Sequence, residues 1–102
     1  MNVTTLKPVA DFLRALDKKE LSRAHRLIIL LQEHGHELGM PVAKPIGRGL
    51  WELRSKNQPS IRILYGFCGG DAVLVHALKK QRPALLPREV ELALARLSAY
   101  CG

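Results

Sequence analysis

The chain has 102 residues, the length of a single domain, and we expect one domain over residues 1–102. Hydrophobic residues make up 47% and charged residues 25%, a balance that excludes a disordered or low-complexity protein. The net charge of +7 favours nucleic acid or an acidic protein as the partner.

The sequence also restricts the compartment. No apolar run approaches the roughly 20 residues of a membrane span, and the first residues lack the basic and apolar regions of a secretory signal. We therefore expect a cytoplasmic protein with no membrane partner.

The two cysteines, Cys68 and Cys101, have no metal-ligand spacing. In the cytosol we expect two free thiols, with one disulfide as the alternative.

Two helices are predicted in the first third of the chain. Apolar side chains recur at helical spacing over residues 8–17, which favours a short amphipathic helix. A second helix is expected to begin near Lys19 and to end at Gly35 or Gly39, since Pro41 prevents its continuation. Together they read as a helical hairpin.

The apolar period then changes from 3.6 to 2 after a loop over residues 42–49. Three strands are predicted, over residues 50–54, 61–67 and 72–78, with turns at 57–60 and 69–71. The third strand is apolar on both faces, as a central strand would be. After a break over residues 83–86, Pro87 begins a last helix.

This order predicts an α+β fold, with a helical hairpin packed on a small antiparallel β-sheet and a C-terminal helix. We expect an antiparallel meander with all the helices on one face. The opposite face of the sheet would then present Glu52, Arg54 and Arg62 together to solvent.

Positive charge is concentrated in one stretch. Between residues 44 and 82 there are eight basic and two acidic residues, whereas the flanking segments are nearly balanced. The basic residues are Lys44, Arg48, Arg54, Lys56, Arg62, Lys79, Lys80 and Arg82. Those that follow the third strand could track a phosphate backbone, with a solvated strand end as the alternative.

Arg54 and Arg62 form the most informative pair. Each occupies the polar phase of its strand, and the short hairpin between them predicts that they lie near each other on one face. Two guanidiniums held on a rigid sheet suit a phosphodiester and the added charge of its transition state. The alternative is that either arginine only pairs with Glu52 or a helix carboxylate.

Two side chains are candidate general bases. His76 lies in the third strand, and nearby arginines would lower its pKa, although a packed, hydrogen-bonded histidine is the alternative. Glu52 is the other candidate, with an ion pair to Arg54 as the alternative. His34 and His36 do not share a helical face, so we expect no metal site. Trp51 and Tyr65 fall in the buried phase and are expected in the core.

Four segments resemble HigB-type toxins of the RelE/ParE superfamily, in the branch described as phage-derived. Residues 42–54 (VAKPIGRGLWELR) resemble its K-x-L-x-x-G-L-W-E-L-R segment, and residues 62–65 (RILY) its R-x-x-Y strand. Residues 78–80 (LKK) resemble its F-x-K-K strand end, and residues 87–93 (PREVELA) its P-x-x-E-I-E-x-A helix start. Relatives begin with a strand, which here would be very short, unless the start site differs.

The resemblance implies a toxin that cleaves ribosome-bound mRNA without metal or cofactor, and a helix-turn-helix antitoxin as its partner. It assigns charge stabilisation to Arg54, Arg62, Lys79 and Lys80. It leaves the acid and the base open, so Glu52 and His76 stay candidates on the strength of their positions alone. Lys44, Arg48, Lys56 and Arg82 would bind the RNA. Where some relatives carry a catalytic Tyr or His, residues 85–87 hold neither. On an open face, Arg62→Ala would abolish cleavage with little loss of stability.

The superfamily also contains gyrase poisons that share the fold. A non-enzymatic toxin, directed at gyrase or binding RNA only, is therefore the alternative function.

Overall fold

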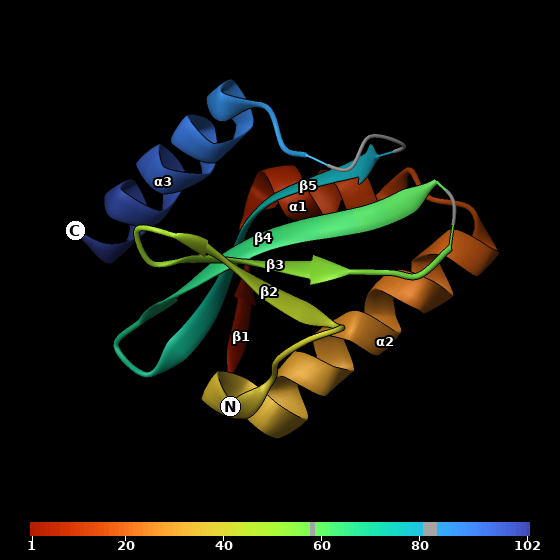
Figure 1. Ribbon diagram of the computed structural model, residues 1–102, viewed down its shortest axis with the longest axis horizontal. Helices are drawn as coiled ribbons and strands as arrows, with labels where there is room; N and C mark the ends of the chain where they lie inside the picture. The colour runs from red at the N-terminus through yellow and green to blue at the C-terminus, as the bar shows by residue number, and fades with distance from the viewer. Residues whose placement is uncertain (58, 81–83) are drawn as a thin grey trace.

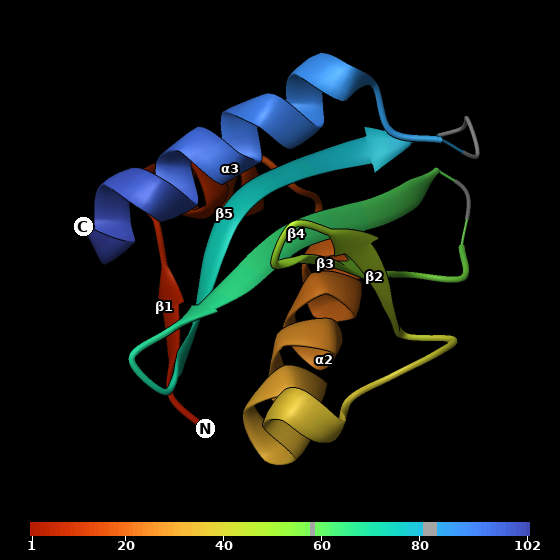
Figure 2. The same cartoon turned by 60° about the vertical axis from the view of Figure 1, so that its left-hand side comes forward.

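A computed structural model describes residues 1–57, 59–80 and 84–102. Its centre is a five-stranded sheet with the order β1-β5-β4-β3-β2, and helices cover both faces (Figures 1 and 2). The elements are β1 (Val3–Thr5), α1 (Lys7–Arg14), α2 (Lys18–His34), β2 (Ala43–Gly47), β3 (Leu50–Arg54), β4 (Ser60–Cys68), β5 (Asp71–Lys80) and α3 (Pro87–Cys101). Within the described residues, no helix is long and apolar enough to cross a bilayer.

The helical hairpin is confirmed, with boundaries set by capping. The Asp17 carboxylate accepts a hydrogen bond from the Glu20 backbone N–H at 2.8 Å, and the Glu20 carboxylate accepts one from the Asp17 N–H at 3.3 Å. This reciprocal cap satisfies N–H groups that have no partner within the helix. Because Asp17 caps α2, α1 ends at Arg14 rather than extending to residue 17. α2 ends at Gly35, whose φ of +54° a glycine adopts without strain.

The expectation that all helices share one face is wrong. α1 and α2 cover a core that contains Leu31, Leu53 and Tyr65. α3 covers a second core on the opposite face, around Leu64 and Val73 (Figure 2). The physical reason is that β4 and β5 carry apolar side chains in both phases, so each face needs a cover.

The sheet is also larger than predicted, and mixed. The three predicted strands form its antiparallel centre: β3 has the predicted bounds, and β4 and β5 are slightly longer than predicted. β2 lies within the predicted loop over 42–49 and pairs antiparallel with β3, and Pro45 is tolerated because β2 is an edge strand. β1, three residues long, pairs parallel with β5, which fits the expectation of a very short first strand. Of the predicted turn at 57–60, residue 58 lies outside the described chain and Ser60 belongs to β4.

Gly66 allows α3 to approach the sheet closely. A Cβ atom at this position would lie 2.4 Å from the Leu97 Cδ2 atom and 3.2 Å from the Gly49 carbonyl oxygen. A side chain at Gly66 would therefore force the Leu97 side chain of α3 to move and would crowd the Gly49 carbonyl oxygen.

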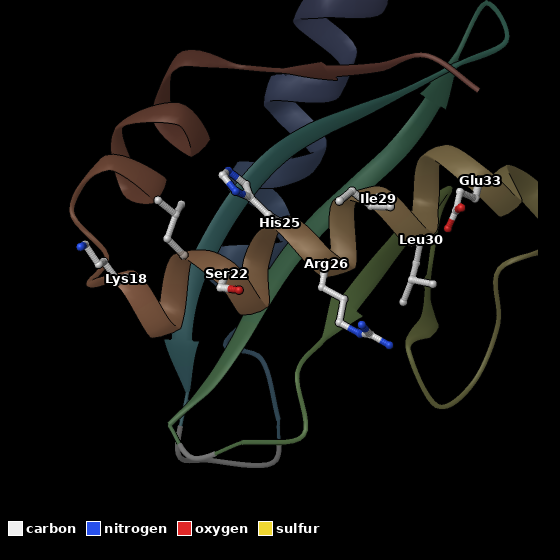
Figure 3. Close-up of a pocket in the computed structure, with 8 residues that line it drawn as sticks. Lys18, Ser22, His25, Arg26, Ile29, Leu30 and Glu33 are labelled. Atoms are coloured by element: carbon white, nitrogen blue, oxygen red, sulfur yellow. The ribbon is translucent and has the colours of Figure 1, made fainter.

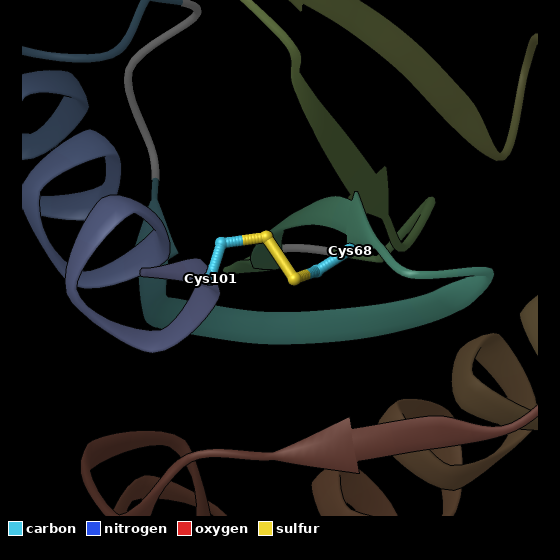
Figure 4. The surroundings of a disulfide bond; sticks show 2 residues. All are labelled: Cys68 and Cys101. Atoms are coloured by element: carbon cyan, nitrogen blue, oxygen red, sulfur yellow. A yellow bond between two sulfur atoms is a disulfide. The ribbon is translucent and has the colours of Figure 1, made fainter.

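The two cysteines are joined, which corrects the expectation of free thiols (Figure 4). Cys68 ends β4 and Cys101 ends α3, and their Cα atoms are 5.8 Å apart, within the ordinary range for a disulfide. The packing of α3 on the sheet brings together two thiols that are 33 residues apart in the chain. The bond ties the end of the last helix to the β4–β5 hairpin.

Reduction of this disulfide should destabilise the protein. Closing a loop of 33 residues restricts the unfolded chain, and the loop-entropy relation gives a stabilisation of about 3–4 kcal/mol. Urea unfolding with and without dithiothreitol would measure the difference, and a Cys68→Ser/Cys101→Ser variant should be insensitive to the reductant. Identical curves for the native chain in both conditions would contradict the pairing.

Candidate active site

The strand register assembles a polar site on the α3 face of the sheet. Glu52 lies opposite Lys44 on β2 and opposite Leu64 on β4, and Leu64 lies opposite His76 on β5. In the next row, Arg54 lies opposite Arg62. Paired side chains on adjacent strands are neighbours about 5 Å apart, so the register alone brings Arg54, Arg62 and Glu52 together.

Glu52 holds the two arginines. Its Oε1 atom lies 3.1 Å from an Nη atom of Arg62 and 3.5 Å from the Nε atom of Arg54. Like charges that face each other across a strand pair repel, and the carboxylate between them offsets part of that repulsion. Two positive charges and one negative charge leave a net positive site.

A small hydrogen-bond network fixes the Arg62 guanidinium. Its Nε–H donates to the Ser60 hydroxyl at 2.9 Å, and that hydroxyl donates to the Ser55 carbonyl oxygen at 2.9 Å. The Ser55 hydroxyl in turn accepts from the Ile61 N–H at 2.8 Å. Arg62 is therefore held by both strands of the β3–β4 hairpin rather than free to rotate.

The expectation that Glu52, Arg54 and Arg62 are displayed on an open face is wrong in part. They do lie on the face of the sheet that α1 and α2 leave uncovered. However, α3 and residues 84–86 cover that face, and Glu52 and Arg62 are 2% and 7% exposed. Only the Arg54 side chain, 29% exposed, reaches solvent substantially. Among the described residues, the Glu52 Oε2 atom has no hydrogen-bond partner.

The arginine pair opens into a pocket of about 340 Å³. Besides Arg54 and Arg62, the lining includes Lys56 and the hydroxyl-bearing residues Ser55 and Ser60. No carboxylate lines this pocket within the described part of the chain. A hollow with three cationic side chains and two hydroxyl groups suits a phosphate group.

Lys79 and Lys80, at the end of β5, lie on opposite faces of the sheet. Adjacent residues of a strand point to opposite faces. The Lys79 ammonium lies 2.9 Å from the Glu20 carboxylate of α2, on the hairpin side. Lys80 is buried on the α3 side, where it donates to the Ala84 carbonyl oxygen and lies 3.4 Å from Glu89. Only Lys80 shares the face of the arginine pair.

His76 lies on the same face, beneath α3. Burial lowers the pKa of His76, and the Arg96 guanidinium, 3.2 Å from its Nδ1 atom, lowers it further. A guanidinium only donates, so Nδ1 must accept and the neutral ring carries its proton on Nε2. The expected direction of the pKa shift is confirmed, but its electrostatic cause is Arg96 rather than Arg54 or Arg62.

This shift makes stability depend on pH. The unfolded chain binds a proton at His76 as the pH falls through about 6.5, while the folded protein resists it. The free energy of unfolding should therefore fall as the pH drops from 7 to 5, with a slope of at most about 1.4 kcal/mol per pH unit from this group. Urea titrations across this window would measure it, and His76→Gln should flatten the profile. The lowered carboxyl pKa values of Glu89 and Asp11 act only at more acidic pH.

The predicted RNA-binding residues are scattered. Lys44 is exposed beside Glu52, and Lys56 is exposed at the rim of the arginine pocket. Arg48 lies in the β2–β3 turn and pairs with Glu91 of α3 at 2.6 Å, away from the pocket. Arg82 lies outside the described residues.

Four charged residues near the site were not predicted. Arg96 and Glu89 reach it from α3, where Glu89 contacts Lys80 and Arg96 contacts His76. Burial raises the pKa of Glu89, but the Leu86 N–H and Lys80 outweigh it and hold that pKa below its usual value. Arg23 and Arg26 of α2 lie near Arg54. Their sequence pattern is that of a solvated helix face, so only the fold could show their placement.

The remaining expectations concern the core and metals. Tyr65 is buried, as predicted, and burial raises its pKa to about 12; Trp51 packs partly buried against the same core. Across the described residues, no group of three or more His, Cys, Asp or Glu side chains could hold a metal ion.

Comparison with known proteins agrees with this architecture. The family model described as "Phage derived protein Gp49-like (DUF891)" matches residues 11–98. A search of curated proteins gives no match. Among solved structures, the chain is similar to the isolated E. coli RelE toxin, with a TM-score of 0.65 and 12% identity over 94% of this chain and 97% of that one. The chain therefore belongs to the Gp49-like family of phage-derived proteins, and its fold is similar to that of the RelE toxin.

Proposed function

We propose that the protein is the toxin of a type II toxin–antitoxin system and acts as a metal-independent endonuclease on ribosome-bound mRNA in the cytoplasm. Its partners would be the ribosome, mRNA and a helix-turn-helix antitoxin that neutralises it. The observation that carries this proposal is the facing pair Arg54 and Arg62, which opens into a pocket of about 340 Å³ without a carboxylate among its described lining residues.

Cleavage of RNA by its own 2′-oxygen depends mainly on stabilising the charge of the transition state, which the two arginines can do. The 2′-oxygen of the RNA would attack the adjacent phosphorus, giving its proton to a base, while the 5′-oxygen leaves and takes up a proton. The products are a 2′,3′-cyclic phosphate and a 5′-hydroxyl. The transition state carries extra negative charge on the phosphoryl oxygens, and guanidiniums held in advance stabilise it without reorganising.

Glu52 suits the role of a positioning residue, because one of its oxygens contacts both arginines. Its second oxygen is the acceptor available for the 2′-hydroxyl proton, although it is buried in the free protein. The Nε2–H of the neutral His76 ring can donate a hydrogen bond to the leaving oxygen, which would take its proton from solvent. Lys80 adds positive charge from the same face, whereas Lys79, paired with α2, would act at most from the other side.

The alternative is a toxin without nuclease activity, directed at gyrase or binding RNA only. The observation that favours it is the burial of Glu52 and Arg62, together with the absence of Tyr and His at positions 85–87. Binding alone needs neither base nor acid.

Primer extension distinguishes the nuclease from a toxin without nuclease activity. Purified protein is added to a defined mRNA with or without ribosomes. Cuts at discrete positions that appear only with ribosomes, leaving 5′-hydroxyl ends, are the expected result. Failure to cut in either condition, combined with an SOS response on expression, would instead favour the gyrase-directed function.

A further inference from the structure

A second cationic pocket lies on the other side of the β3–β4 connection. It has a volume of about 310 Å³, which is within the range of small-ligand sites. Its rim carries four positive side chains and no carboxylate among the described residues, and its floor is apolar. By rim we mean the cationic lining residues, which are exposed or half-buried: Arg23, Arg26, Arg54 and Lys56. By floor we mean the apolar lining residues, which are buried or half-buried: Leu27, Leu30 and Val42.

This pocket adjoins the one that contains Arg62. Arg54, Ser55 and Lys56 line both, so the two hollows lie on either side of one short segment of chain. Figure 3 shows Arg26 and Leu30 leaving α2 on one side of the helix and His25 on the other, and Arg26 and Leu30 line this pocket together with Val42 and Arg54. α2 thus places a cation and an apolar side chain together at the edge of the arginine site.

An apolar floor beneath a cationic rim matches the two parts of a nucleotide. The flat face of a base can pack on Leu30 and Val42, and guanidiniums can stack on the base or hold a phosphate. Asn57, at the rim, offers an amide that can donate to or accept from a base edge. The cationic rim would repel a divalent cation and would add no binding energy for an apolar ligand.

We propose that this second pocket binds one nucleotide of single-stranded RNA next to the phosphate held by Arg54 and Arg62, so that the RNA strand crosses the segment from Arg54 to Asn57. The inference rests on the proposed function, since it extends the same RNA site. It makes Arg23 and Arg26 RNA-binding residues and not merely part of a solvated helix face.

The test measures binding of a 2′-O-methyl oligoribonucleotide, which cannot be cleaved, by fluorescence anisotropy over a range of salt concentrations. The Arg23→Ala/Arg26→Ala variant should bind more weakly, and its slope of log affinity against log salt should be less steep by about 1.4, or 0.7 for each lost phosphate contact. The matched control is Arg14→Ala/Arg88→Ala, which removes the same charge from exposed helix positions. Equal losses in both variants would overturn the proposal.

A second measurement tests whether the pocket binds the nucleobase. An abasic nucleotide moved along the oligonucleotide should lower affinity about fivefold or more at one position next to the bound phosphate. The Leu30→Glu variant should show no such position. If no position matters in the native protein, the apolar floor does not hold a base and the proposal fails.

Cleavage assays separate this proposal from the proposed function. If the native protein does not cut mRNA but the pocket variant still loses RNA affinity, the function fails and the nucleotide pocket stands. If an abasic site beside the cut slows cleavage, the bound nucleotide belongs to mRNA. If the pocket variant loses affinity only for small ribosomal subunits without mRNA, the bound nucleotide belongs to ribosomal RNA. If the Arg23→Ala/Arg26→Ala variant binds RNA normally but no longer binds an acidic protein partner, the proposal is overturned.

Discussion

Replacing Arg62 by alanine should lower the free energy of unfolding by about 3 kcal/mol or more. Arg62 is the better of the two partners of Glu52, at 3.1 Å against 3.5 Å for Arg54, and Glu52 is 2% exposed. Removing the guanidinium leaves a buried carboxylate with one longer ion pair, and the Ser60 hydroxyl loses the Arg62 donor while it keeps its bond to the Ser55 carbonyl oxygen. The sequence alone predicts little loss of stability in Arg62→Ala because it places Arg62 on an open face of the sheet. The burial of Arg62 and Glu52 replaces that expectation with a large loss.

Urea unfolding followed by circular dichroism measures this effect. The informative control is the double variant Glu52→Leu/Arg62→Leu, which removes both charges and fills the volume with apolar side chains. Replacing a buried ion pair in this way is often neutral or stabilising, so the double variant should be more stable than Arg62→Ala. A loss below about 1 kcal/mol in Arg62→Ala would mean that Glu52 does not depend on this partner.

The Arg54→Ala variant should retain its fold and lose cleavage about 10²- to 10³-fold in the rate of the chemical step. Arg54 is partly exposed, and Glu52 keeps its shorter ion pair to Arg62 when Arg54 is removed. The lost guanidinium is one that would face the transferred phosphoryl group, so the effect should fall on the rate more than on binding.

Single-turnover cleavage of ribosome-bound mRNA, with unfolding curves as a check on stability, would measure that loss. The matched control is Arg48→Ala, because Arg48 pairs with the exposed carboxylate of Glu91 and does not line the arginine pocket. Equal rates for Arg54→Ala and the native protein would remove Arg54 from the catalytic assignment. A collapse of stability in Arg54→Ala would show that its role is structural instead.

The sequence predicts most of the elements because their signals are local. The cap at Asp17, Pro87 at the start of α3 and the alternation in β3 and β4 each depend on a few neighbouring residues. The pairing of Arg54 with Arg62 was predictable for the same reason, since a short hairpin fixes which residues face each other.

What could not be predicted depends on contacts between distant segments. The position of α3 decides that Glu52 and Arg62 are buried, that Lys80 meets Glu89 and that Cys68 meets Cys101. None of these pairs has a local signature. β2 was missed because Pro45 and two glycines indicate a loop, and only an edge position makes a strand there acceptable.

The disulfide also changes how the chain would respond to mechanical tension. If the two ends are pulled apart, the force follows the backbone as far as Cys68, crosses the sulfur bridge to Cys101 and leaves at Gly102. The 32 residues between Cys68 and Cys101 carry no load, so the stretched protein is shorter by about 110 Å than a reduced one. His76, Lys80 and Arg96 all lie in that shielded loop, whereas Arg54 and Arg62 lie in the segment that is stretched.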